Sequence, residues 1–153
     1  MRISVKCSTA VHMLLMIAEL SGRNKVTSGM LASSVGCNPV EIRKLLSSLK
    51  KAGIIDVSRG TGGTALRRAP ADITLLDIYS AVDATSLNEL IGVHMHPVDE
   101  CPFGRNIQAL LAEPYAEIGD AVRDRMRAVT LERLLSRLAE MEPSIHVQQE
   151  PTA

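Results

Sequence analysis

The chain has 153 residues, of which 46% are hydrophobic and only 2% aromatic, and its formal net charge is zero. A chain of this length forms one domain, or a small domain with an extension. Its core must consist of Leu, Ile, Val, Met and Ala, which favours helices over an all-β sandwich. No apolar run reaches the roughly 18 residues of a membrane span, and the start does not resemble a signal peptide. We therefore expect a cytoplasmic protein that is mainly helical.

The zero net charge conceals an asymmetry between the two parts of the chain. Residues 1–68 hold 11 of the 17 Lys and Arg residues but only 3 of the 17 Asp and Glu residues. Such a split indicates a polyanion as the partner of the basic part. Chance clustering of solvated surface charges would give the same numbers, so the charge alone favours a polyanion only weakly.

The first two predicted elements are helices that end at glycines. Apolar residues recur at helical spacing between positions 10 and 18, and this helix stops at Ser21-Gly22. Thr27 or Ser28 is expected to cap a second, short helix, which Gly36 terminates. Its inward-facing residues are predicted to be Met30, Leu31 and Val35.

A third helix and a hairpin follow directly. Asn38 is expected to cap this helix, with Pro39 at its first position, where the missing N–H costs nothing. The apolar stripe that continues to Gly53 consists of Val40, Ile42, Leu45, Leu46 and Leu49. The β-prone runs "IIDVS" and "TALRR" then bracket "RGTGG", which predicts a hairpin with a basic, glycine-rich tip.

The second part of the chain is predicted to contain three more helices. Thr74 caps the first of them, "LLDIYSAVD", with Asp77 completing a capping box. Residues 84–104 are irregular, and a long helix is expected from about 106 to 128, with Pro114 kinking it or marking a fresh start. Thr130 is expected to cap a final helix over 131–141, and residues 143–153 form a flexible tail.

A short helix, a tight turn at Gly36, a second helix and a basic hairpin together indicate a winged helix-turn-helix over residues 1–83. In this interpretation the second helix of the motif enters the DNA major groove, where Arg43 can form a bidentate contact with guanine. Arg59 at the wing tip would enter a narrow minor groove. Arg43 could instead be a solvated surface residue, pair with Glu41, or contact a phosphate.

The chain resembles the Rrf2 family of bacterial transcription regulators. The resemblance rests on "MRISVKCSTAVHMLLMIAE", "VGCNPVEIRKLLSSLKKAGII", "SRGTGG", "PADITLLDIYSAVD" and "HPVDECPFGRNIQALL", and it covers about residues 1–140. It implies a homodimer on a palindromic operator of double-stranded DNA, with base reading at positions 38, 40 and 43. The residues expected at the DNA are Thr27, Ser28, Asn38, Pro39, Val40, Arg43, Lys44, Lys50, Lys51, Arg59 and Thr61.

The same resemblance implies that helices within residues 105–142 form the dimer and that 84–104 connect them to the winged domain. The apolar stripe of the long helix is narrow, as expected of a seam that a second copy covers. Its predicted interface residues are Ile107, Leu111, Ile118, Ala121 and Val122. We expect a repressor rather than an activator, because dimers bound at promoters chiefly block polymerase.

Cysteine usage separates this chain from the iron–sulfur members of the family. Those members place three closely spaced cysteines before the long helix, whereas this chain has only Cys101 there. We expect no cluster, and the single "CP" motif is similar to the YwnA-like subgroup. Cys101 near a helix N-terminus, with His94, His96 and Arg105 nearby, is a candidate redox switch, although a packing role is equally consistent. Cys37, beside the cap of the third helix, is a candidate second thiol, although we expect it to be buried, and Cys7 is treated with the same caution.

Other classes of function find less support in the sequence. The histidines of "HMH" and Cys101 follow no metal-ligand spacing rule, so we expect no metal site. No nucleophile–base pair or phosphate loop is visible, because "RGTGG" lacks the lysine and helix of a P-loop, so an enzyme is not expected. The alternatives left open are a winged-helix protein-interaction module and an effector- or metal-binding sensor without a strong DNA preference.

Overall fold

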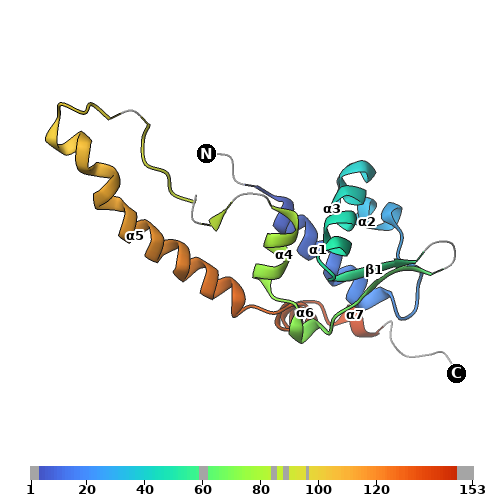
Figure 1. Ribbon diagram of the computed structural model, residues 1–153. Coiled ribbons are helices and arrows are strands. Elements are labelled where there is room, and N and C mark those ends of the chain that lie inside the picture. The colour runs from blue at the N-terminus through green and yellow to red at the C-terminus, as the bar shows by residue number, and fades with distance from the viewer. Residues whose placement is uncertain (1–3, 59–61, 84–85, 88–89, 96, 148–153) are drawn as a thin grey trace, which may run out of the picture. The chain divides into compact units, whose positions relative to one another are not determined.

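The computed structural model describes residues 4–58, 62–83, 86–87, 90–95 and 97–147 (Figure 1). These residues divide into two compact units: residues 1–83 with 127–153 form unit 1, and residues 84–126 form unit 2. The elements of unit 1 are α1 (Lys6–Leu20), α2 (Ser28–Val35), α3 (Pro39–Lys51), β1 (Ile55–Ser58), β2 (Gly63–Leu66), the 3-10 helix η1 (Pro70–Asp72), α4 (Leu75–Val82), α6 (Leu131–Met141) and α7 (Ser144–Val147). Unit 2 contains α5 (Pro102–Arg127) except for its last residue. None of the helices described combines the length and apolar character needed to cross a membrane.

The core of unit 1 is built around α1. Its buried residues Ala10, Met13, Leu14 and Ile17 recur every three or four positions, so they share one face of the helix. That face packs where α1 contacts α2, α4, α6 and β2. Aliphatic residues from the other elements complete the core: Val26, Leu31, Ile42, Leu45, Leu46, Leu49, Ile54, Ile55, Ile73, Ile78 and Leu131. This is the mainly helical winged helix-turn-helix that the sequence predicts.

The caps around the turn confirm the predicted helix boundaries. Thr27 Oγ1 accepts a hydrogen bond from the Met30 backbone at 3.2 Å, and Asn38 Oδ1 accepts one from the Val40 backbone at 2.8 Å. Gly36 ends α2 at φ +72°, a left-handed conformation that glycine adopts without strain.

Two of the residues predicted to face inward are exposed. The side chains of Met30 and Val40 are 39% and 49% exposed. Both lie in the first turns of their helices, before the helix reaches the core, so the apolar pattern overestimated their burial. Val40 is therefore available at the surface, where its predicted role at the DNA requires it to be.

The hairpin pairs β1 with β2 in antiparallel register, from Ile55 opposite Leu66 to Ser58 opposite Gly63. The start of β2 is held against the segment before α2, because the Thr64 amide donates to the Val26 carbonyl at 3.1 Å. Gly63 has φ +71°, and a Cβ there would lie only 2.9 Å from Cγ of Lys25, so glycine is required for this close approach. The predicted tip residues Arg59 and Thr61 lie outside the described residues.

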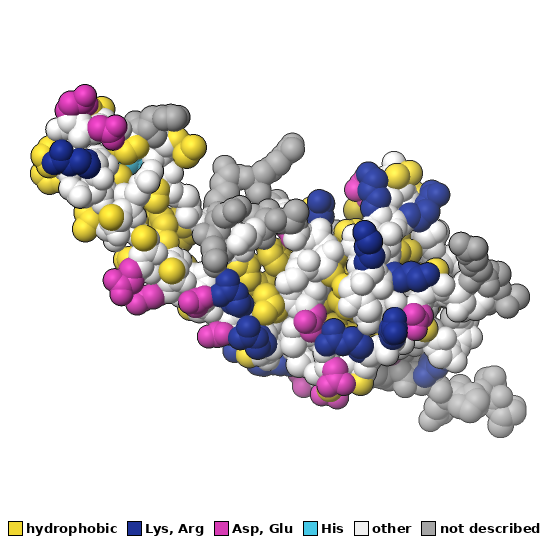
Figure 2. Space-filling view, in the orientation of Figure 1, with side chains coloured by type: hydrophobic (Ala, Val, Ile, Leu, Met, Phe, Trp, Pro, Cys, Tyr) yellow, Lys and Arg dark blue, Asp and Glu magenta, His cyan; other side chains and the backbone are white. Residues whose placement is uncertain are grey.

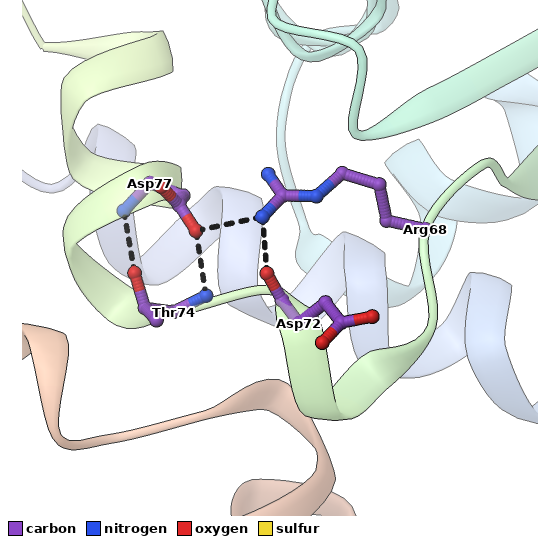
Figure 3. Close-up of polar contacts among 4 residues, drawn as sticks. All are labelled: Arg68, Asp72, Thr74 and Asp77. Carbon is purple, nitrogen blue, oxygen red and sulfur yellow. Dashed lines mark hydrogen bonds and ion pairs between the residues drawn. The ribbon is translucent and has the colours of Figure 1, made fainter.

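A polar junction joins the base of the hairpin to α4 (Figure 3). Thr74 and Asp77 form the predicted capping box, with hydrogen bonds of 2.9 and 3.1 Å between the backbone of each and the side chain of the other. Arg68, just after β2, donates to Asp77 Oδ2 at 3.3 Å and to the Asp72 carbonyl. The end of the hairpin and the start of α4 therefore share one hydrogen-bonded cluster.

The chain returns to unit 1 beside this junction. Thr74 and Thr130 form an isolated antiparallel bridge, in which the Leu75 amide donates to the Val129 carbonyl and the Leu131 amide to the Ile73 carbonyl, both at 2.8 Å. Thr130 caps α6 as predicted. The helix α6 packs against α1 and η1 and belongs to unit 1, whereas residues 105–142 were predicted to act together as dimerisation helices. The predicted tail, residues 143–153, begins with the short helix α7.

In unit 2, α5 starts earlier than predicted and is continuous through Pro114. The expected start near Asn106 is wrong because Pro102 fits the first turn of a helix, where no N–H is needed. Asn106 Nδ2 donates to the Pro102 carbonyl at 2.7 Å, within the turn that the prediction left irregular. Burial among the described residues of α5 is confined to Gly119, so the apolar side chains of this helix are at least partly exposed.

Candidate nucleic-acid interface

Helix α3 has one apolar and one polar face. Ile42, Leu45, Leu46 and Leu49 are buried in the core. The opposite face exposes Arg43, Lys44, Ser47, Lys50 and Lys51. Figure 2 shows Lys and Arg side chains gathered over α3 and the strands. This gives unit 1 a slim helix with a basic outer face, the shape that fits a DNA major groove.

Arg43 is held in the first turns of α3. Its Nε donates to the Pro39 carbonyl at 3.2 Å, four residues earlier in the same helix. This bond leaves the two terminal NH₂ groups of the guanidinium for a further partner, and these are the groups that form a bidentate contact with guanine O6 and N7. The structure places Arg43 on the exposed face, as the sequence predicts.

Glu41 pairs with Lys44 rather than with Arg43. The Lys44 ammonium lies 2.7 Å from Glu41 Oε1. This hydrogen bond, and then the charge of Lys44, lower the pKa of the Glu41 carboxyl below its usual value, with a further contribution from Lys6. Because both side chains are exposed, the pair contributes little to stability. The carboxylate of Glu41 does offset the positive charge of Lys44. The Lys44 ammonium would have to break this ion pair in order to contact a phosphate.

Part of the predicted DNA-contact set lines one cleft. This cleft has a volume of about 400 Å³ and lies between the segment before α2, helix α3 and the hairpin. Thr27, Ser28, Arg43 and Lys50 line it. Asn38, Pro39, Val40, Lys44 and Lys51 are exposed on α3 and its cap but do not line the cleft. The site is thus an exposed helix face with a basic cleft beside it.

Sequence reasoning missed three polar residues of this cleft, Lys25, Ser47 and Thr64. Ser47 lies one helical turn after Arg43, so the i, i+4 spacing could have placed it beside Arg43. No local pattern marks Lys25, because it reaches the cleft only through the packing of β2 against the segment before α2.

The cysteines occupy three different environments. The prediction that Cys37 is buried is wrong: it is exposed, in the turn between Gly36 and the Asn38 cap. Cys7 is half-buried in α1, and burial together with the charge of Asp83 raises the pKa of its thiol. Cys101 is half-buried directly before α5, where its carbonyl accepts from the Arg105 amide at 3.0 Å.

The cysteines and histidines are spread along the chain, and none is grouped with other metal-ligating side chains among the residues that the structure describes. A cluster takes about four cysteine or histidine ligands. In the part of the chain that the structure describes, no three His, Cys, Asp or Glu side chains lie close enough together to hold a metal ion. Cys7 and Cys37 belong to unit 1, whereas Cys101 belongs to unit 2. His94 is exposed, and His96 lies outside the described residues.

The predicted dimer residues all lie on α5 and none is buried. Ile118 is 42% exposed, and Leu110, outside the predicted stripe, is 66% exposed. Ile107, Leu111 and Val122 are half-buried, and Ala121 is exposed. The apolar stripe of α5 is therefore not completely covered by the residues that the structure describes.

Comparisons with known proteins agree with this architecture. Residues 3–137 match the Rrf2 family, described as "Iron-dependent Transcriptional regulator". The chain is 35% identical over 136 residues to YwnA of Bacillus subtilis strain 168, a candidate HTH-type transcriptional regulator, covering 89% of this chain and 98% of YwnA.

Solved structures give the same result. A candidate DNA-binding protein has 30% identity and a TM-score of 0.66, covering 85% of this chain and 98% of its own. A candidate transcriptional regulator from Lactobacillus plantarum has 28% identity and a TM-score of 0.74, covering 96% and 98%. These relatives are regulators and not enzymes, as the sequence predicts. The chain belongs to the Rrf2 family of transcriptional regulators.

Proposed function

We propose that this chain is a dimeric, sequence-specific DNA-binding repressor that acts in the cytoplasm on a palindromic operator. The observation that carries the proposal is the exposed basic face of α3, with Arg43 held by the Pro39 carbonyl. In each protomer α3 enters the major groove, and the hairpin reaches the adjacent backbone and minor groove. Arg43 reads at least one G·C pair in each half-site.

The exposed stripe of α5 supports the dimer. A lone protomer leaves apolar side chains such as Ile118 in water, and a second copy of the same helix removes them from water at once. Two-fold symmetry of the protein would then be mirrored in a palindromic operator. Such a dimer on a promoter excludes polymerase, which makes repression the expected outcome.

A thiol switch at Cys101 is the finer part of the proposal. Cys101 lies at the start of the helix proposed to form the dimer, so its oxidation could change how two copies meet. The exposed thiol of Cys37 lies next to the cap of α3, so oxidation there would act directly on DNA contact. Single Cys101→Ser and Cys37→Ser variants separate the two routes.

The experiment that tests this function is selection of bound duplexes from a random pool, with reduced protein and again after mild oxidation. A palindrome with a G·C pair in each half-site, recovered by the reduced protein, supports the regulator. Loss of binding on oxidation that Cys101→Ser prevents and Cys37→Ser does not supports the switch. Enrichment of no sequence would contradict sequence-specific DNA binding, and an equal response of Cys101→Ser and wild type would remove Cys101 from the mechanism.

A further inference from the structure

The cleft beside α3 combines a cationic rim with an apolar floor. Lys25, Arg43 and Lys50 come from two different segments and place three positive charges around it. Val26 and Leu46 line the floor and are almost completely buried. No carboxylate is found among the lining residues that the structure describes. A ligand that fits must present a negative charge at the rim and an apolar surface to the floor.

Hydroxyl groups add directional partners to this charge. Thr27, Ser28 and Ser47 line the same cleft. Thr27 Oγ1 accepts from the Met30 amide, so its own O–H is free to donate elsewhere. Ser28 begins α2, and the amide of a first helical residue has no partner inside the helix. Oxygen atoms of an anion are the natural acceptors for such donors.

The position of Lys25 is built into the fold. The Thr64 amide donates to the Val26 carbonyl at 3.1 Å, which ties the segment before α2 to β2. Gly63 allows the Lys25 stem to pass close by, since a Cβ at Gly63 would lie 2.9 Å from Lys25 Cγ. The stem of Lys25 therefore lies against the start of β2, and Lys25 lines the cleft from the hairpin side.

We propose that this cleft holds one sugar-phosphate unit of the DNA backbone, with Lys25 and Ser47 as contacts to it. The phosphate oxygens meet the cationic rim and the hydroxyls, and the deoxyribose packs over Val57, which is 36% exposed. The proposal rests on the proposed DNA-binding function and refines it. Lys25 positions the protein on the duplex without reading sequence, whereas Arg43, at the edge of the cleft, turns toward the bases.

The test uses the full-length protein and the duplex recovered by selection. Lys25→Gln removes one charge, Ser47→Ala removes one hydroxyl, and Arg137→Gln is the control, since Arg137 is an exposed residue of α6 that does not line the cleft. We expect Lys25→Gln to weaken binding about three- to tenfold, equally for the operator and for random duplex. The slope of log K against log salt should become shallower by about one, while Arg137→Gln leaves both unchanged.

A neutral methylphosphonate placed at each backbone position in turn identifies the phosphate. At one position per half-site, the methylphosphonate should lower the affinity of wild type. At that same position it should not lower the affinity of Lys25→Gln any further, because the substitution and the methylphosphonate remove the same contact. If the losses multiply at every position, or if Lys25→Gln and Arg137→Gln behave alike while wild type binds its operator, the cleft assignment is wrong. Failure of wild type to bind any duplex would instead overturn the proposed function.

Free inorganic phosphate is the other source of the same chemistry. Millimolar phosphate is added at constant ionic strength, and the amide NMR signals of residues around the cleft are followed. We expect these signals to shift equally in wild type and in Lys25→Gln. Saturable, Lys25-dependent binding of phosphate without any effect of Lys25→Gln on DNA affinity would assign the cleft to a free anion and overturn its assignment to the DNA backbone.

Discussion

The apolar residues of helices α3 and α5 differ in how far they are buried. Every member of the α3 stripe from Ile42 to Leu49 is buried by elements of unit 1. The α5 stripe is longer, but among the described residues of α5 burial is confined to Gly119, and the side chain of Ile118 remains 42% exposed. The apolar face of α3 is covered by its own chain and its outer face is polar, whereas the apolar face of α5 stays partly exposed, which is why we propose that a second copy covers it.

The largest expected effect is on the free energy of unfolding, for a substitution in the buried face of α3. Leu49→Ala creates a cavity in the core of unit 1 and should lower the free energy of unfolding by about 2–5 kcal/mol. The matched change Leu110→Ala, at a residue of α5 that is 66% exposed, should cost well under 1 kcal/mol. Urea unfolding followed by circular dichroism measures both. Equal destabilisation by the two variants would mean that α5 is buried to the same extent as α3.

The second largest effect should be on the dissociation constant of the proposed dimer. Ile118→Asp places a charge in the stripe and should raise the dimer dissociation constant at least about tenfold, because a desolvated carboxylate without a partner is costly. Ala116→Asp, at an exposed position outside the stripe, is the control. Sedimentation equilibrium gives both constants. If the dimer is unchanged by Ile118→Asp, the stripe is not its interface.

On the polar face of α3, Arg43→Ala should cost about 1–3 kcal/mol at one base pair of each half-site and relax the preference there. Lys51→Ala, later on the same helix, should weaken binding to all duplexes by a common factor. Competition binding with single-base variants of the operator distinguishes the two patterns. An unchanged base preference in Arg43→Ala would show that this guanidinium does not read a base.

The smallest effect concerns the junction in Figure 3. Partial burial would raise the pKa of the Asp77 carboxyl, but hydrogen bonding with Thr74 and the nearby Arg68 lower it overall below its usual value. The folded state therefore favours the carboxylate, so this stabilisation is present above the unfolded pKa of about 3.9 and is lost as the pH falls through the lower folded value. Asp77→Asn should cost about 0.5–1 kcal/mol at pH 7.

Thermal unfolding from pH 7 to pH 2 tests this dependence. The difference in stability between wild type and Asp77→Asn should shrink as the pH falls below about 4. Asp72→Asn, which keeps the backbone carbonyl that Arg68 contacts, serves as the control. A difference that is constant down to pH 2 would show that the charge of Asp77 does not contribute.

Local signals predicted much of unit 1. The caps at Thr27, Asn38 and Thr74 and the hairpin each depend on a few consecutive residues, and all are as predicted. The errors lie where burial depends on distant segments. Cys37 was expected inside but is exposed, in the short turn between Gly36 and Asn38.

The same limit applies to the candidate site. Arg43 and Lys50 stand on one helix, so spacing alone places them together. Lys25 joins them only because β2 pairs its Thr64 amide with the Val26 carbonyl, and no local pattern encodes that contact. Sequence patterns therefore predicted the exposed basic face of α3 but not the cleft beside it.

The bridge between Thr74 and Thr130 has a consequence for how this family member can change over time. The bridge lies within unit 1 and joins the chain on the two sides of unit 2, because the chain leaves unit 1 after Asp83 and rejoins it at Arg127. The entropy of closing a loop rises only with the logarithm of its length. Insertions or deletions within residues 84–126 would thus cost unit 1 little stability. The segment that carries Cys101 can diversify while the DNA-facing fold stays constant.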